Sequence, residues 1–186
     1  MSRPSPKRDQ LVATATRLFC AEGFHATGID RVLEEAGVAK MTLYKHFASK
    51  DELIAACLAQ VADVNRAAFD RALEAAEGDP VTRLRRALGT FAARAAQAGF
   101  TGCPFHHAQA EFAAPEHPAH CAVVEYKAWF RGRIEELLTE AGLEDPRGRA
   151  DEVLLAFEGA LAVAPLRVVD DLPDRLDRLV GRTLTG

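Results

Sequence analysis

Hydrophobic side chains recur at three- and four-residue spacing through most of the 186-residue chain, and this is the period of an amphipathic helix. β-branched residues are sparse and form no alternating runs, so no strand is predicted. Prolines and glycines separate the periodic stretches, since proline suits the first turn of a helix and glycine its end. These signals predict an all-α protein of about nine helices, over residues 7–22, 29–36, 40–47, 51–76, 80–99, 104–114, 118–141, 146–164 and 173–184.

Polar residues with N-capping ability stand before several of these stretches. Thr27 is the expected N-cap of the second helix, with Asp30 three residues further on. The run Ser49–Glu52 is a capping box, in which the two side chains satisfy each other's backbone N–H groups. Asp79 is the expected N-cap of the fifth helix, and Pro80 is its expected first helical residue.

The second and third predicted helices form a helix-turn-helix, because a turn of only three residues that contains Gly37 separates them. We expect Val38, Leu43 and Phe47 to pack inward, against Phe19, Ile29 and Leu33. The outward positions then carry cations, hydroxyls and an imidazole that could contact phosphates and base edges: Lys40, Met41, Thr42, Tyr44, Lys45 and His46. The alternative is an ordinary helical hairpin with a solvated polar face.

Charge is divided unevenly along the chain, although the net charge of −4 does not by itself suggest a DNA-binding protein. Residues 1–50 hold 8 Lys and Arg against 5 Asp and Glu, whereas residues 51–186 hold 15 against 22. A basic N-terminal part on an acidic body suits phosphate binding by one end of the molecule.

Three segments carry a family resemblance: Gly23–Ile29 (GFHATGI), Ala36–Phe47 (AGVAKMTLYKHF) and Ser49–Leu53 (SKDEL). This long, position-specific pattern resembles the DNA-binding region of the tetracycline-repressor (TetR) family and covers about residues 7–58. The rest of the chain resembles the family only in length and helical plan. The resemblance implies a DNA-binding domain over residues 1–50, with the fourth helix as connector, and an effector-binding and dimerisation domain over residues 51–186.

The resemblance also implies roles for individual residues. Base edges would be contacted by Lys40, Met41 and Lys45, and phosphates by Thr27, Thr42, Tyr44, His46 and Lys50. His25, in the loop before the motif, is expected to be structural or solvated. The implied protein is a regulator, a repressor in most of its relatives, that binds double-stranded operator DNA as a dimer and is released by a small-molecule effector.

A homodimer is implied through the eighth and ninth helices, because the family pairs its last two long helices in a four-helix bundle. Small residues near Phe157 would permit close approach of these helices: Gly159, Ala160 and 162–164. Alternatively, Phe157 and Leu161 complete the core of a single subunit.

The effector site is expected to be an apolar cavity, with His106 or Glu111 as a polar group that orients the ligand. Its candidate aromatic residues are Phe91, Phe105, Phe112, Trp129, Phe130 and Phe157. An alternative is a metal-responsive regulator, since imidazole and thiolate ligands gather in one stretch: Cys103, His106, His107, His117, His120 and Cys121. Their spacing fits no four-ligand pattern, and we expect neither a metal nor a cofactor.

Other classes of protein fit the sequence less well. No nucleophile elbow or phosphate-binding glycine loop is present, so an enzyme is not expected. An adaptor that does not bind DNA would have no need of the outward residues at positions 42, 44, 46 and 50. No apolar run is long enough to cross a membrane, and the basic residues up to Arg8 lead into an amphipathic segment. We therefore expect a cytoplasmic protein, with its four cysteines as free thiols.

Overall fold

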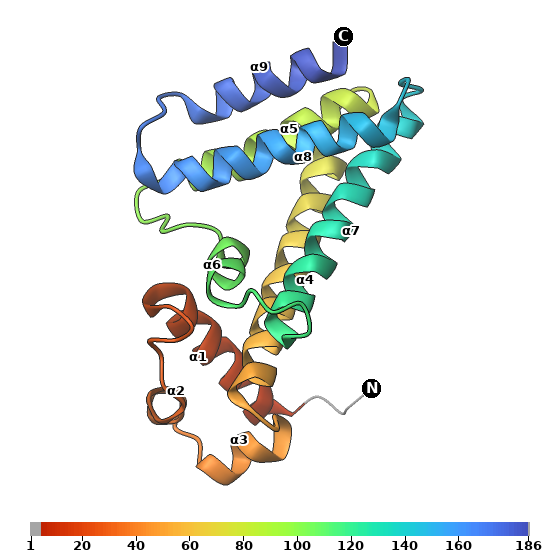
Figure 1. Ribbon diagram of the computed structural model, residues 1–186. Coiled ribbons are helices and arrows are strands. Elements are labelled where there is room, and N and C mark those ends of the chain that lie inside the picture. Colours follow the sequence, from red (N-terminus) through yellow and green to blue (C-terminus); the bar gives the residue numbers. More distant parts are fainter. Residues whose placement is uncertain (1–4, 186) are drawn as a thin grey trace. The chain divides into compact units, whose positions relative to one another are not determined.

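The computed structural model describes residues 5–185, so the ends of the two predicted domains, residues 1–4 and 186, lie outside the described part. Within that range the chain contains nine α-helices and one short 3₁₀-helix but no strand, which confirms the all-α prediction (Figure 1). The elements are α1 (Pro6–Glu22), α2 (Ile29–Ala36), α3 (Lys40–His46), α4 (Lys50–Ala75), α5 (Pro80–Ala95), α6 (Pro104–Glu111), α7 (Pro118–Glu140), α8 (Pro146–Val163), η1 (Ala164–Leu166) and α9 (Leu172–Thr185).

Side chains cap the starts of α4, α5 and α8. The hydroxyl of Ser49 accepts the N–H of Glu52 at 3.1 Å, and the Glu52 carboxylate accepts the N–H of Ala48 at 2.7 Å. This is a capping box in which the Glu52 carboxylate accepts the N–H of Ala48 and not that of the N-cap residue Ser49. Asp79 accepts the N–H of Thr82 at 2.9 Å at the start of α5, as predicted.

The prediction that Thr27 caps α2 is wrong. The N-cap of α2 is Gly28, and no side chain caps it. The Thr27 hydroxyl instead donates to the carbonyl oxygen of Gly23 at 2.8 Å, within the loop itself. A threonine before a helix can bond either forward to the helix or back to its own loop, and the buried position of this side chain selects the second.

Helix packing divides the chain into two compact units. Unit 1 takes in the chain up to Val64 together with Pro104–Tyr126, and unit 2 combines Asn65–Cys103 with the chain from Lys127 onward. The boundaries fall inside α4 and α7, so they differ from the division at residues 50 and 51 that the resemblance suggested. The predicted division concerns function and stays a prediction.

Unit 1 has a core made by α1, α2 and α3 with the first turns of α4. Its fully buried side chains include Leu11, Leu18, Phe19, Leu43, Leu53, Ile54 and Leu58. On α6, Phe105 is also buried and stacks on Tyr126 of α7, with ring centroids 4.1 Å apart and nearly parallel planes. The segment 104–126 therefore folds with the N-terminal helices and belongs to their unit.

Unit 2 has a second core, in which α5 packs against α9 and α8. Leucines and alanines of α5, α8 and α9 interlock with the end of α7, and an aromatic group occupies one part of this core. The ring of Phe69 lies edge-on to Phe91, Trp129 and Phe130, at centroid distances of 5.1–6.3 Å. In the part of the chain described here, no helix is long and apolar enough to span a membrane.

Candidate nucleic-acid interface

The turn between α2 and α3 is built on Gly37. This residue is left-handed (φ 61°), and its N–H points back to the carbonyl oxygens of Leu33 and Glu34 at the end of α2. The N–H of Val38 also donates to the Leu33 carbonyl, at 3.1 Å. Such a C-terminal cap needs a residue that tolerates positive φ, so glycine here allows α3 to begin after only three intervening residues.

The inner face of α3 anchors the helix to its supports. Leu43 is fully buried and Phe47, the C-cap residue, is nearly so. Leu33 of α2 and Phe19 of α1 are buried in the same unit, as predicted, and α3 contacts both of these helices. Val38 and Ile29, which were also expected in this packing, are half-buried. A seven-residue helix is not stable alone, so this packing is what holds α3 in place.

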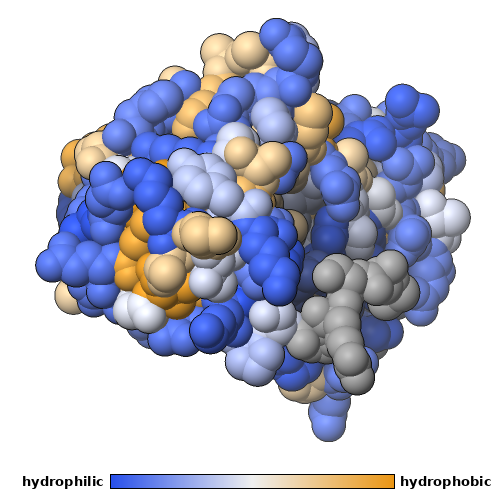
Figure 2. All heavy atoms as spheres, turned by 90° about the horizontal axis from the view of Figure 1, so that it is seen from below, coloured by the Kyte–Doolittle hydropathy of each residue, from blue (hydrophilic) through white to orange (hydrophobic). Residues whose placement is uncertain are grey.

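The outer face of α3 is exposed and carries most of the predicted base-contacting residues. Met41 is 86% exposed and Tyr44 is 50% exposed, and Lys45 is exposed beside them. Positions 41, 44 and 45 lie on one face of a helix. Figure 2 shows a face of the molecule on which hydrophilic side chains predominate, with hydrophobic ones gathered in a patch on its left. A surface helix with exposed cationic and amphipathic side chains is suited to lie in a DNA groove.

Lys40, at the first position of α3, is also exposed and lies near an acidic residue. Its Nζ atom is 3.4 Å from Oδ1 of Asp30 on α2, and both side chains are largely exposed. An exposed ion pair of this kind contributes little to stability, so a DNA acceptor can replace Asp30 at small cost.

The remaining predicted phosphate contacts are less free. Thr42 is half-buried, and the ring Nε2 of His46 lies 3.4 Å from the hydroxyl of Ser5. Lys50, the first residue of α4, donates to the carbonyl oxygen of His25 at 3.5 Å, and its Nζ lies 5.9 Å from the ring centroid of Phe19. These side chains occupy the margin of the α3 surface and are held by intramolecular contacts.

Thr27 does not join this surface. Its side chain is only 1% exposed, and its hydroxyl is engaged with Gly23. The interface that we propose below therefore leaves Thr27 out, because a phosphate needs a hydroxyl that reaches solvent.

The residues predicted for the effector site are distributed over both units. Phe105, His106, Glu111 and Phe112 belong to unit 1, and Phe91, Trp129, Phe130 and Phe157 to unit 2. In unit 2 the four aromatic rings contact one another or Phe69. In unit 1, both carboxylate oxygens of Glu111 accept backbone N–H groups, from Phe24 at 3.1 Å and His25 at 2.7 Å. Glu111 is thus already engaged, which argues against the predicted role of orienting an effector.

The contact between Glu111 and the loop was missed by the sequence interpretation. His25 was expected to be structural or solvated, and its ring indeed lies 4.9 Å from that of Phe112 while remaining exposed. Glu111 is 87 residues from Phe24 and 86 from His25 in the chain, and no local pattern in the sequence signals a contact over such a separation.

The cysteines and histidines of the metal-responsive alternative do not form a metal site. Among the described residues no group of three or more His, Cys, Asp or Glu side chains could hold an ion. His117 stacks on Phe112 at 4.4 Å and approaches Asp51, whereas His120 contacts the carbonyl of Phe112. Ring stacking and backbone contacts thus position the imidazoles of His117 and His120, and the structure does not support a metal-responsive regulator.

No disulfide joins any of the four cysteines in the described part of the chain. Cys57 and Cys103 are buried, and Cys121 is exposed. Burial raises the pKa of the Cys57 thiol to about 12, an effect that the hydrogen bond with Thr16 only partly offsets. Cys57 is therefore neutral and chemically inert in the folded protein.

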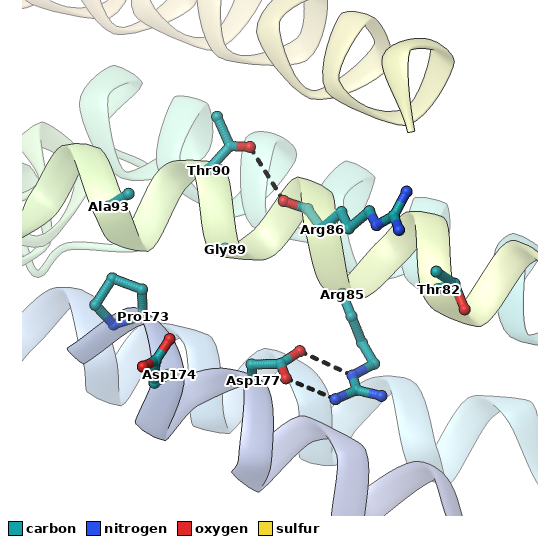
Figure 3. A pocket seen from close by; sticks show the side chains of 9 residues that line it. All are labelled: Thr82, Arg85, Arg86, Gly89, Thr90, Ala93, Pro173, Asp174 and Asp177. Carbon is teal, nitrogen blue, oxygen red and sulfur yellow. Dashed lines mark hydrogen bonds and ion pairs between the residues drawn. The ribbon is translucent and has the colours of Figure 1, made fainter. Parts of the chain in front are cut away.

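A groove of about 600 Å³ lies between α5 and α9 in unit 2 (Figure 3). Its lining combines two ion-paired residues with small and polar ones: Thr82, Arg85, Arg86, Gly89, Thr90, Ala93, Pro173, Asp174 and Asp177. None of the residues predicted for an effector site lines this groove.

Comparison with known proteins identifies the N-terminal segment. Residues 11–57 match the model of the family described as bacterial regulatory proteins, tetR family. The transcriptional activator FasR of Mycolicibacterium smegmatis is 39% identical over 85 residues, which cover 46% of this chain and 38% of FasR. The chain thus aligns with well under half of that relative's length. The transcriptional regulator LmrA of Bacillus subtilis is 25% identical over 92% of this chain and 97% of its own.

A solved structure extends the likeness to nearly the whole chain. A TetR-family transcriptional regulator from Streptomyces coelicolor is 34% identical, with a TM-score of 0.87 over 96% of this chain and 94% of that one. Both the helix-turn-helix and the helical remainder are therefore shared. The chain belongs to the TetR family of DNA-binding transcriptional regulators.

Proposed function

We propose that this regulator is a repressor that binds a palindromic operator as a homodimer and is released by a small-molecule effector. The observation that carries the DNA-binding part is the two-sided character of α3. Its inner residue Leu43 is fully buried, whereas Met41, Tyr44 and Lys45 on the opposite side are exposed. Only a helix braced in this way can present side chains to base edges in a defined register.

Within this surface we assign base contacts to Lys40, Met41 and Lys45. Lys40 or Lys45 would donate to guanine O6 or N7, and the Met41 side chain would pack on a thymine methyl group. The phosphate contacts fall to Tyr44 on the exposed face of α3 and to Thr42, His46 and Lys50 at its margin. Phosphate contacts set orientation and most of the affinity, and base contacts set the sequence preference.

The homodimer would form through α8 and α9. Leu155, which is 72% exposed, lies on the same face of α8 as Gly159 and Ala162, because their spacing of four and three residues is that of a helix stripe. On α9, Leu179 is exposed as well. Phe157, by contrast, is buried in the core of its own unit. The pairing surface is therefore better described by Leu155, Gly159, Ala162 and Leu179 than by the larger set drawn from the sequence.

The effector would be a small, largely apolar molecule. Phe91 and Trp129 are the partly buried members of the aromatic group in unit 2, so they can gain contacts with such a ligand. Effector binding would favour a spacing of the two α3 helices that no longer fits successive major grooves. A coupling free energy of about 1–3 kcal/mol lowers operator affinity by roughly 5- to 150-fold.

The direction of regulation depends on where the operator lies relative to the promoter. The relative FasR is named an activator, and repression is proposed here from the family as a whole. A reporter gene behind a selected operator decides between the two.

The experiment that tests the proposal is selection of bound fragments from random duplex DNA, repeated with candidate small apolar ligands. We expect an inverted repeat whose halves are about one helical turn apart, and its loss when an effector is present. Binding that is independent of sequence would contradict an operator-specific regulator, and a single unrepeated half-site would contradict the dimer.

A further inference from the structure

The side chain of Glu111, the last residue of α6, holds the loop between α1 and α2. Its Oε1 accepts the N–H of Phe24 at 3.1 Å, and its Oε2 accepts the N–H of His25 at 2.7 Å. Each carboxylate oxygen thus has its own backbone donor. Charge-assisted hydrogen bonds of this kind are roughly twice as strong as neutral ones and have a defined direction.

Aromatic contacts reinforce the same attachment. The ring of Phe24 is buried, 5.5 Å from that of Phe19 and 5.8 Å from that of Phe112. The ring of His25 lies 4.9 Å from that of Phe112, and its Nε2 is 3.3 Å from the Glu111 carbonyl oxygen. Both loop residues therefore contact the end of α6 through backbone and side chain alike.

The loop leads directly to the DNA-binding elements. It ends at Gly28, the N-cap of α2, and α2 packs against α3. The carbonyl oxygen of His25 also accepts from Nζ of Lys50, at 3.5 Å. A single peptide segment at His25 therefore connects the Glu111 carboxylate, through an N–H group, with the Lys50 ammonium, through a carbonyl group.

We propose that Glu111 is a positioning residue for DNA binding: by fixing the Phe24 and His25 amides it orients the His25 carbonyl and with it the Lys50 side chain. This inference rests on the proposed role of Lys50 in contacting a phosphate. A lysine side chain has four rotatable bonds, so an oriented acceptor near its end narrows the positions of its ammonium group before DNA arrives.

Two variants and a matched control test this role. Glu111→Gln keeps one amide acceptor and replaces the other by a donor, and Glu111→Ala removes both. Glu116→Gln is the control, because Glu116 is exposed, lies in the same unit and carries the same charge. Removing a negative charge should by itself leave DNA affinity unchanged or raise it slightly, since phosphate repulsion falls. Any loss of affinity at position 111 then reflects geometry.

Operator affinity is measured by fluorescence anisotropy, in the wild-type and the Lys50→Ala background. We expect a loss of about fivefold to twentyfold for Glu111→Gln and a larger one for Glu111→Ala, with none for Glu116→Gln. In the Lys50→Ala background the loss from Glu111→Gln should shrink to less than about threefold, because the oriented group is gone. Urea unfolding of each variant shows that it is folded at the temperature of the assay.

Two outcomes would overturn the inference. One is equal affinity of the position 111 variants and the Glu116→Gln control, and the other is an equal loss from Glu111→Gln in both backgrounds, which a merely structural role would give. Failure of the proposed function looks different, because the wild-type protein would then show no operator preference at all.

Discussion

Arg85 of α5 and Asp177 of α9 are joined by two parallel hydrogen bonds, from Nε to Oδ1 at 2.8 Å and from Nη2 to Oδ2 at 2.6 Å. The hydrogen bonds to Asp177 raise the pKa of Arg85. The guanidinium crosses α9 next to Gly181, where an added Cβ would lie 3.3 Å from Nη2. The pair links α9 to α5 beside the buried contacts of Leu176 and Val180 (Figure 3).

Replacing Arg85 by Met should lower the free energy of unfolding by about 0.5–1 kcal/mol, because both side chains are more than a third exposed and water screens their attraction. Urea unfolding at low and high salt measures the effect. Arg71→Met, at an exposed position of the same unit, is the control. Equal effects of the two substitutions would show that the ion pair contributes nothing.

The double change Tyr44→Phe with Lys50→Ala should weaken binding to operator and to unrelated DNA alike. Loss of one cationic contact should also reduce the slope of log affinity against log salt by about 1. Anisotropy titrations at salt concentrations from about 50 to about 200 mM measure both the affinity and the salt slope. An unchanged slope would remove Lys50 from the phosphate contacts.

Lys45→Ala should instead relax the sequence preference at one position of each half-site. Loss of a lysine contact to a guanine edge costs about 1–3 kcal/mol against the preferred base and little against the others. Binding to a set of single-base operator variants measures this. A uniform loss over all variants would reassign Lys45 to the phosphate backbone.

Leu155→Arg should dissociate the dimer, because the added charge would be desolvated within an apolar pairing surface. Val124→Arg is the matched control, since Val124 is 53% exposed on α7 in the other unit. Sedimentation or light scattering gives the mass of each variant. A Leu155→Arg protein that remains dimeric would place the interface on another surface.

Cys57 should resist alkylation in the folded protein, whereas the exposed Cys121 reacts. The pKa of Cys57 in the folded protein, about 12, lies above the 9.0 of an unfolded thiol. The neutral thiol therefore stabilises the folded state below about pH 9, and that contribution is lost as the pH rises toward 12. Iodoacetamide labelling at pH 8–9, in the range of an ordinary thiol pKa, followed by mass spectrometry measures the two sites. Equal labelling of Cys57 and Cys121 without denaturant would contradict this.

The sequence alone determined the helices and the DNA-binding motif. Both ends of α2 and the start of α3 agree with the prediction, and the end of α3 and both ends of α4 differ from it by one residue. Such agreement is expected because caps, prolines and glycines act within a few residues, as Gly37 and Ser49 show. The ends of α5 and α6 were placed too late, by four and three residues. The exposed face of α3 followed from the helical period, which places Met41 and Lys45 opposite Leu43.

Only the tertiary structure decided which partners these residues have. The Thr27 hydroxyl bonds back to its own loop, and the Glu111 carboxylate accepts from amides 86 and 87 residues away. His117 stacks on the ring of Phe112, whereas His120 contacts the Phe112 carbonyl oxygen. Residue type shows that a carboxylate will find donors, but it does not show which ones, because many backbone amides are chemically equivalent. Which amide a carboxylate reaches depends on how the helices pack. That packing is the combined result of many weak contacts between segments far apart in the chain.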